Sequence, residues 1–190
     1  MNIQPIVTPR LELVRATVPV LRAAALENRF AMAEMLAAQV TEDWPPQFMD
    51  DACAMVADQL DREPEPGIWS MWFVLQRGPR VLVGTFGFKA PPADGRVDLG
   101  YSIVASHQKR GYATEATRAM IDLAFAQDGV RTIVGETFDE LVASIRVLEK
   151  CGFARCAAGV TGFSGEENVV RYELPRERWR PAGEKAREVL

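Results

Sequence analysis

The segment that decides the fold is Gln108-Lys109-Arg110-Gly111-Tyr112-Ala113, which separates a strand pattern over 97–104 from a helix pattern over 111–127. The first turn of a helix leaves backbone N–H groups without partners, and the helix dipole favours a negative charge beside them. Gly111 permits a tight turn and a close approach of the backbone to a ligand, and two basic residues precede it. The sequence therefore predicts that this loop holds a phosphate group.

The elements around this loop indicate a mixed α/β fold. Apolar, aromatic and β-branched runs predict strands over 11–14, 69–75, 81–88, 97–104, 131–137, 153–160 and 169–174. Helix patterns begin after Thr17 and run through the thirties, and they recur over 47–60, over 111–127 and from Asp139 to a stop at Gly152. Strands interleaved with helices favour a mixed sheet with helices on both faces.

Composition limits the classes of protein that this chain can belong to. Its 190 residues, 48% of them hydrophobic, predict a single domain over 1–180 followed by a charged tail over 181–190. We find neither a membrane-spanning run nor a secretion signal, and therefore expect a cytoplasmic protein that does not bind membranes. A net charge of −4 without a basic stripe argues against nucleic-acid binding. Three cysteines without a CxxC pair and a single histidine predict reduced thiols and no metal site.

Further motifs give the chain a resemblance to a known family. They are Thr8-Pro9-Arg10-Leu11-Glu12-Leu13, Asp98 to Ile103, Gln108 to Glu115, Ala143 to Lys150 before Gly152-Phe153, and Arg171 to Leu174. Together they resemble the GNAT superfamily of acyl-CoA N-acyltransferases, and within it the branch related to ribosomal-protein N-terminal acetyltransferases. The resemblance spans nearly the whole chain. It implies an α+β (mixed α/β) fold with a splayed, mostly antiparallel sheet of six to seven strands and helices on both faces.

The resemblance also implies acetyl-CoA as the acyl donor, with CoA as a product. In such proteins the strands at 97–104 and 131–137 part to admit the pantetheine arm, and the loop after the first of them takes the pyrophosphate. A backbone N–H of that strand polarises the acetyl carbonyl. The residues expected to contact the cofactor are Ile103, Val104, Gln108, Lys109, Arg110, Gly111, Tyr112, Ala113, Thr114 and Arg146.

The resemblance places two carboxylates on the parting strands as candidates for proton transfer. The acceptor amine attacks directly, and an α-amino group with a pKa near about 8 needs only a weak base. Glu136 is the first choice and Asp98 the second, although each could instead make a structural contact. His107 is either an exposed loop residue or a cofactor contact.

Two positions depart from the family pattern. Many relatives carry a tyrosine that protonates the thiolate where this chain has Leu148, so Ser144, one turn earlier, becomes the candidate donor. The branch usually has an asparagine that touches the pantetheine where this chain has Leu141. Its loss removes one polar contact, on the order of 1 kcal/mol.

Three functions compete. The leading one moves an acetyl group from acetyl-CoA to a primary amine, either a protein N-terminus or a small molecule, within a ternary complex. The two departures motivate an alternative, a non-catalytic acyl-CoA-binding or sensing module. A third is an unrelated nucleotide-binding domain. A homodimer is compatible with the sequence.

The acceptor site is expected from the early helices with their Trp44-Pro45-Pro46 junction, the hairpin, and the turn over 159–168. Aromatic residues of this region are expected more often in the core than in a pocket. The acidic residues between Glu42 and Asp61 form either a solvated helix face or a rim that attracts a cationic acceptor.

Overall fold

The computed structural model describes residues 3–49 and 51–180, so the predicted tail over 181–190 lies outside the described residues. The chain forms two compact units. The first, called the N-terminal unit, comprises the chain up to Pro91 together with Tyr101–Ala116, and the second, the C-terminal unit, comprises Pro92–Gly100 and the chain from Thr117. The expectation of a single domain over 1–180 stays a prediction.

The N-terminal unit is built on an antiparallel sheet. Its strands, in spatial order, are β1 (Ile6–Val7), β2 (Leu11–Arg15), β4 (Met71–Gln76) and β5 (Val81–Phe88). A short strand, β3 (Gln39–Val40), pairs with β5 in parallel. Strands β4 and β5 are buried at almost every position, which explains their continuous apolar sequence.

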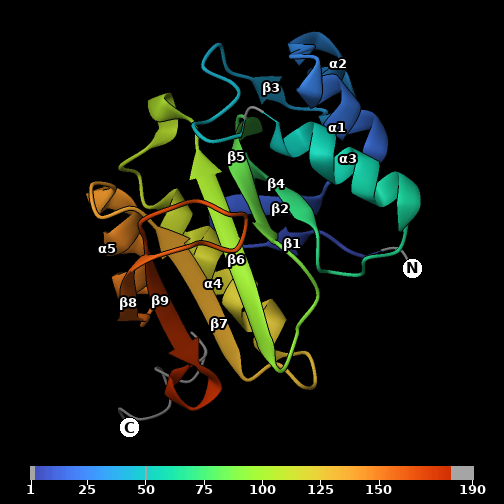
Figure 1. The fold of residues 1–190 in the computed structure, drawn as a ribbon. Coiled ribbons are helices and arrows are strands. Elements are labelled where there is room, and N and C mark those ends of the chain that lie inside the picture. The colour runs from blue at the N-terminus through green and yellow to red at the C-terminus, as the bar shows by residue number, and fades with distance from the viewer. Residues whose placement is uncertain (1–2, 50, 181–190) are drawn as a thin grey trace, which may run out of the picture. The chain divides into compact units, whose positions relative to one another are not determined.

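Three helices complete the N-terminal unit: α1 (Val18–Ala25), α2 (Arg29–Leu36) and α3 (Ala52–Arg62), with α1 in contact with both of the others (Figure 1). Their apolar side chains share one core cluster with β4, in which Leu21, Met32, Ala57 and Phe73 are completely buried. This unit thus forms a core from helix stripes packed on a sheet.

The prediction of a single helix from Thr17 through the thirties is wrong, because the helix is interrupted between Ala25, where α1 ends, and Arg29, where α2 begins. Glu27 adopts a left-handed φ of 52°, and the Asn28 side chain accepts a hydrogen bond from the Ala31 N–H at 3.1 Å. Asparagine is a favoured N-cap because it satisfies an otherwise unpaired donor, so it starts a new helix here. The next helix, α3, begins at Ala52 rather than near Gln47.

The C-terminal unit contains the other strands. The first part of β6 (Arg96–Ile103) pairs in parallel with β7 (Thr132–Thr137), which is antiparallel to β9 (Val169–Pro175), which is antiparallel to β8 (Ala154–Val160). The pairing of β6 with β7 ends at Leu99 and Gly135, although both strands continue.

Two further helices are α4 (Tyr112–Phe125), which belongs to both units, and α5 (Val142–Lys150). Leu148 of α5 packs on Gly135, where an added Cβ would lie 2.6 Å from a Leu148 methyl carbon. The expected cap at Asp139 is wrong, since α5 has Leu141 at its N-cap position and Asp139 accepts a hydrogen bond from Arg155 at 2.9 Å instead. Short 3₁₀ turns lie at Ala105–His107 and Arg176–Arg178.

These elements make a mixed α/β fold with a mostly antiparallel open sheet, as expected. The described residues hold nine strands rather than six or seven, because the two-residue strands β1 and β3 are too short to leave a periodic pattern in the sequence. Within residues 3–49 and 51–180, every helix is too short or too polar to cross a membrane.

Candidate cofactor-binding site

The loop before α4 has the backbone geometry of an anion site. Gly111 has a φ of 81° and its carbonyl accepts the Glu115 N–H at 3.0 Å, so Gly111 is the residue from which the helix starts. The N–H groups of the first helical turn have no acceptors within the helix. Lys109 is also left-handed, with a φ of 60°. Such a conformation strains a residue other than glycine, and strained residues cluster at binding sites.

A half-buried carboxylate holds this loop against the start of β2. Glu115 accepts hydrogen bonds from the Thr8 hydroxyl (2.6 Å), the Arg10 N–H (2.9 Å) and the Arg10 Nε (2.7 Å). The Arg10 guanidinium also donates to the Arg110 carbonyl at 2.8 Å. We call these four residues the Arg10–Glu115 clamp. Burial disfavours the charged carboxylate, but the hydrogen bonds from Thr8 and Arg10 outweigh it and lower the pKa of Glu115 below its ordinary 4.5.

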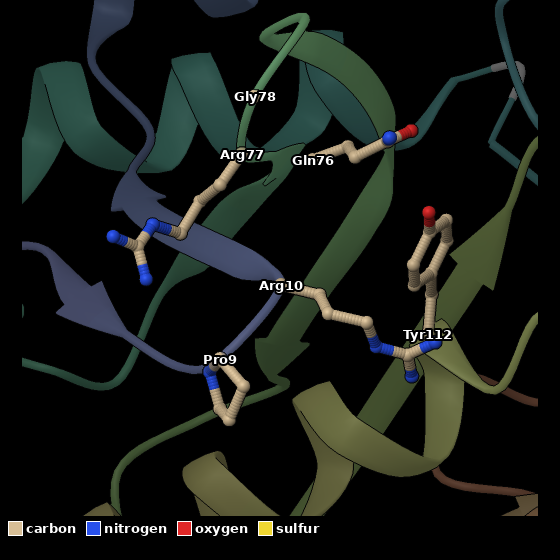
Figure 2. Close-up of a pocket in the computed structure, with 6 residues that line it drawn as sticks. All are labelled: Pro9, Arg10, Gln76, Arg77, Gly78 and Tyr112. Atoms are coloured by element: carbon tan, nitrogen blue, oxygen red, sulfur yellow. The ribbon is translucent and has the colours of Figure 1, made fainter.

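The clamp borders a cavity of about 400 Å³ (Figure 2). It is lined by Pro9, Arg10, Gln76, Arg77, Gly78 and Tyr112. The Arg10 guanidinium carbon lies 5.0 Å from the centre of the Tyr112 ring, and Arg77 donates to the Thr8 carbonyl at 2.8 Å. Both arginines line this cavity, and the charge of Arg10 is balanced by Glu115.

The strand end that precedes the loop is fixed by close backbone contacts. A Cβ on Gly84 would lie 2.2 Å from the Ser102 carbonyl oxygen, so only glycine allows β5 to approach β6 here. The Val104 N–H donates to the Val83 carbonyl at 3.0 Å, and the Gln108 side chain donates to the Ile103 carbonyl at 2.9 Å. Gln108 thus ties the loop to the strand end in addition to any role with the cofactor.

The segment between β3 and α3, here called the 41–49 loop, is attached to the same strand end. Asp43 accepts from both the N–H (2.8 Å) and the hydroxyl (3.1 Å) of Ser106. The Ser102 hydroxyl donates to the Gln47 carbonyl at 2.9 Å. Farther along, the Thr85 hydroxyl lies 3.4 Å from the Met49 sulfur. This part of the predicted acceptor region therefore lies along the strand that leads to the cofactor loop.

Ionisation in this region is set by the same contacts. Burial opposes the charge of Asp43, yet hydrogen bonds from the Ser106 N–H and hydroxyl lower its pKa. Burial and the charge of Arg110 lower the pKa of His107, whose Nδ1 lies 2.9 Å from the Ser106 hydroxyl. His107 is consequently neutral near pH 7.

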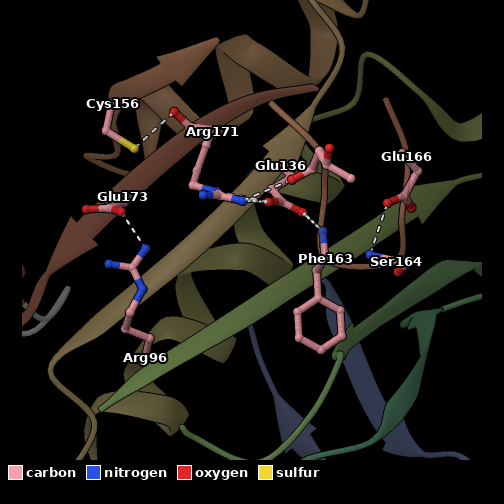
Figure 3. Close-up of polar contacts among 9 residues, drawn as sticks. Arg96, Glu136, Cys156, Phe163, Ser164, Glu166, Arg171 and Glu173 are labelled. Carbon is pink, nitrogen blue, oxygen red and sulfur yellow. Dashed lines mark hydrogen bonds and ion pairs between the residues drawn. The ribbon is translucent and has the colours of Figure 1, made fainter. Parts of the chain in front are cut away.

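Glu136, the first candidate for the base, is a buried carboxylate that is hydrogen-bonded to two other residues of the C-terminal unit (Figure 3). Its Oε1 accepts from the Arg171 Nε and Nη2 at 3.0 and 2.8 Å, and its Oε2 accepts from the Phe163 N–H at 2.8 Å. The Glu136 side chain is 5% exposed, and Arg171 stands directly opposite it on β9. The hydrogen bonds that Arg171 donates to this carboxylate, followed by the charges of Glu136 and Asp98, raise the pKa of Arg171.

No local pattern in the sequence identifies Arg171 as a functional residue. It lies in the stretch Arg171 to Leu174, and the strand register places it opposite Glu136. Thr8, Arg10 and Glu115 likewise lie in family-like motifs that carry no local sign of their mutual contacts.

The other predicted site residues have these positions. Asp98 is half-buried on β6, opposite Val134. Ser144 lies in the first turn of α5, where its N–H donates to the Leu141 carbonyl at 2.9 Å, and Arg146 is exposed two residues farther along the helix. Leu148 is 1% exposed and belongs to the core.

Nine of the predicted residues thus lie together in the N-terminal unit, namely Ile103, Val104, Gln108, Lys109, Arg110, Gly111, Tyr112, Ala113 and Thr114. Asp98, Glu136, Ser144 and Arg146 belong to the C-terminal unit.

The acidic residues between Glu42 and Asp61 and the aromatic residues of this region differ in their surroundings. Arg22 pairs with Asp58 at 2.7 Å and Asp61 at 2.6 Å, so these two carboxylates already have a cation. Trp44 is buried in the core, whereas Phe48 is 61% exposed. The described part of the chain holds no group of residues suited to a metal ion.

Known proteins resemble this chain in sequence and in fold. Residues 20–154 match the family model described as an acetyltransferase (GNAT) domain. The Bacillus subtilis (strain 168) protein named "Uncharacterized N-acetyltransferase YjdG" is 26% identical over 147 residues, which cover 77% of this chain and 87% of that protein.

Solved structures share the fold. RimL, a ribosomal L7/L12 alpha-N-protein acetyltransferase solved with coenzyme A, has a TM-score of 0.65 at 20% identity, covering 90% of this chain and 98% of its own. MccE, a microcin C7 self-immunity acetyltransferase solved with acetyl-CoA and AMP, has a TM-score of 0.61 at 15% identity, covering 88% and 93%.

Proposed function

Because this chain belongs to the GNAT family of acetyltransferases, we propose that a primary amine attacks acetyl-CoA directly on it, within a ternary complex. The family membership makes the chain an acyl-CoA-dependent acetyltransferase with acetyl-CoA as its cosubstrate. What the proposal adds is the route of transfer, the class of acceptor, and the residues that take part.

The observation that carries the proposal is the geometry of the loop before α4. Gly111 lacks a Cβ and is left-handed, so a pyrophosphate can approach the N–H groups of the first helical turn. Lys109 and Arg110 are exposed beside it and supply positive charge. The residues present therefore fit the diphosphate of CoA, while Ile103 and Val104 are the proposed backbone contacts of its pantetheine arm.

Within this proposal, the chain acts by positioning and by handling one proton. Roughly a tenth of an α-amine is already neutral at pH 7, so a distant or weak base is sufficient. Both oxygens of Glu136 are engaged by Arg171 and the Phe163 N–H, which favours a positioning role for this carboxylate. Glu136 and Asp98 both stay proposed as candidates for the proton acceptor. Ser144 is the proposed donor to the departing thiolate, with water sharing that task.

The acceptor is proposed to be either a peptide N-terminus or a small-molecule amine. Both present the same reacting group, and relatives described above are named for N-acetyl transfer. A cytoplasmic location, the lack of nucleic-acid or membrane partners, and a homodimer stay predictions.

The test measures thiol release from acetyl-CoA with a panel of short peptides and small amines at varied concentrations of both substrates. Direct attack predicts amine-dependent thiol release, an N-acetylated product, and double-reciprocal lines that intersect. Parallel lines would indicate an acetylated enzyme intermediate instead. Tight acetyl-CoA binding without turnover across the panel would favour the sensing module.

A further inference from the structure

We propose that Arg10 is a positioning residue for acetyl-CoA, because its guanidinium orients the peptide group between Arg110 and Gly111 so that the Gly111 N–H faces the pyrophosphate. This inference rests on the proposed cofactor site and deepens it by naming the residue that orients its backbone.

The peptide group between Arg110 and Gly111 needs an outside contact to select its orientation. In a planar trans peptide the C=O and N–H bonds point in opposite directions, so turning the group over exchanges a donor for an acceptor at the loop surface. Such a flip reverses the sign of φ at the following residue, and glycine accepts either sign about equally. Gly111 has the positive sign, with a φ of 81°. The local sequence therefore permits both orientations, and only one of them presents this N–H to an anion.

Arg10 supplies the contact that distinguishes the two orientations. Its Nη1 donates to the Arg110 carbonyl at 2.8 Å, and a Cβ on Gly111 would lie 3.3 Å from its Nη2. Because the Arg110 carbonyl points toward Arg10, the Gly111 N–H points away from it. Within the part of the chain that the structure describes, this N–H donates to no other residue. A flipped peptide would lose the hydrogen bond to Arg10 and turn a carbonyl toward the cofactor.

Arg10 is itself held in place by several contacts. Its Nε and its backbone N–H both donate to Glu115, at 2.7 and 2.9 Å, and its carbonyl accepts the Arg77 N–H at 2.8 Å. Figure 2 shows its side chain reaching from the start of β2 to Tyr112, whose ring centre lies 5.0 Å from the guanidinium carbon. The planar guanidinium thus bonds a carboxylate and a carbonyl from different nitrogens. Lysine carries all its donors on one atom and cannot span the two acceptors in the same way.

The role of Arg10 is orientation of the backbone and not attraction of the cofactor. Its charge is balanced by Glu115, with which it forms an ion pair at 2.7 Å. Lys109 and Arg110 are exposed beside the loop and supply the positive charge there. A variant that keeps the charge of Arg10 but loses the planar fork therefore separates orientation from charge.

The kinetic experiment compares the wild type with Arg10→Lys and Arg10→Ala. We expect the KM for acetyl-CoA to rise about tenfold in Arg10→Ala and about threefold in Arg10→Lys, with kcat and the KM for the amine unchanged. Arg15→Ala is the matched control, since Arg15 lies at the other end of β2 and donates to the Gly67 carbonyl at 3.3 Å. It should keep the wild-type KM. A wild-type KM in Arg10→Lys would show that Arg10 acts by charge alone and would overturn the inference.

NMR of the Gly111 amide in the cofactor-free, ¹⁵N-labelled protein tests the orientation directly. Arg10→Lys should give a second Gly111 signal with the scalar couplings of a negative φ, whereas Arg15→Ala should give the wild-type signal alone. A single wild-type Gly111 signal in Arg10→Lys would also contradict the inference.

Calorimetric titration of the wild type with CoA separates this inference from the proposed function. Absence of CoA binding would contradict the cofactor site, while the Gly111 signals of the free protein would still decide whether Arg10 orients the peptide group. CoA binding that is equally tight in the wild type and in Arg10→Ala would leave the cofactor site intact and contradict the role of Arg10.

Discussion

At the scale of single residues, the backbone conformation of a few positions is what makes the candidate site specific. Gly111 and Gly84 are glycines because one is left-handed and the other lies against a carbonyl oxygen. Lys109 and Phe48 adopt left-handed conformations without that freedom. Lys109 lies in the loop that is proposed to bind the pyrophosphate of CoA.

Replacing Lys109 with glycine should raise stability and weaken cofactor binding. Relief of the left-handed strain is worth about 1–2 kcal/mol, which exceeds the about 0.5–1 kcal/mol that glycine costs in chain flexibility. Loss of the positive charge should raise the KM for acetyl-CoA severalfold. Thermal unfolding and steady-state kinetics measure the two effects.

Lys109→Ala is the matched control, since it removes the charge and keeps the strain. It should share the KM increase and be less stable than Lys109→Gly. If the two variants were equally stable, the strain at this position would be negligible.

At the scale of elements, two carboxylates fasten one element to another. Glu115 joins the first turn of α4 to the start of β2, and Glu136 joins β7 to β9 and to the turn before it. Each carboxylate accepts three hydrogen bonds, which offset the loss of water around a charge that is half-buried at Glu115 and buried at Glu136.

The Arg10–Glu115 clamp should make the free energy of unfolding depend on pH. The folded-state pKa of Glu115 lies below its ordinary value of 4.5, so its contribution is complete above pH 4.5 and is lost as the pH falls through the folded pKa. Glu115→Gln should destabilise the protein by about 1–3 kcal/mol at pH 7. The difference in free energy of unfolding between the wild type and Glu115→Gln should shrink below pH 4.5.

Melting temperatures of both proteins between pH 7 and the acid transition measure this gap. Glu140→Gln, at an exposed position, is the control and should follow the wild-type curve. A gap that stays constant with pH would show that Glu115 contributes by shape and not by charge.

Glu136→Gln tests whether this carboxylate positions the turn or takes the proton. Breaking a buried ion pair costs about 3–5 kcal/mol, and the 31% exposure of Arg171 should bring the loss toward the lower end. A positioning role predicts a higher KM for the amine and an unchanged shape of the pH profile of kcat/KM. Loss of the acidic limb of that profile would instead identify Glu136 as the base.

The control is Glu173→Gln, which breaks the neighbouring ion pair with Arg96 on the same sheet (Figure 3). It should leave the KM for the amine unchanged. A rise equal to that of Glu136→Gln would mean that any lost charge on this sheet disturbs the site.

At the scale of the whole molecule, the order of elements was largely readable from the sequence. Long periodic segments such as α4 and the β4–β5 hairpin were predicted to within a few residues, because their apolar spacing repeats over several turns or pairs. The break at Asn28 and the short strands β1 and β3 were missed, since a cap or a two-residue strand carries almost no periodic signal.

The sequence by itself determined the family and the acyl donor, and it predicts a phosphate-binding role for the loop from Gln108 to Ala113, because such a role rests on local backbone chemistry at a helix start. Only the tertiary structure decided which partners the charged residues have. Thr8 and Arg10 meet Glu115, and Arg171 meets Glu136, across 35 to 107 positions of chain. Hydrogen bonds between distant strands depend on register and burial, which no local pattern of residues encodes.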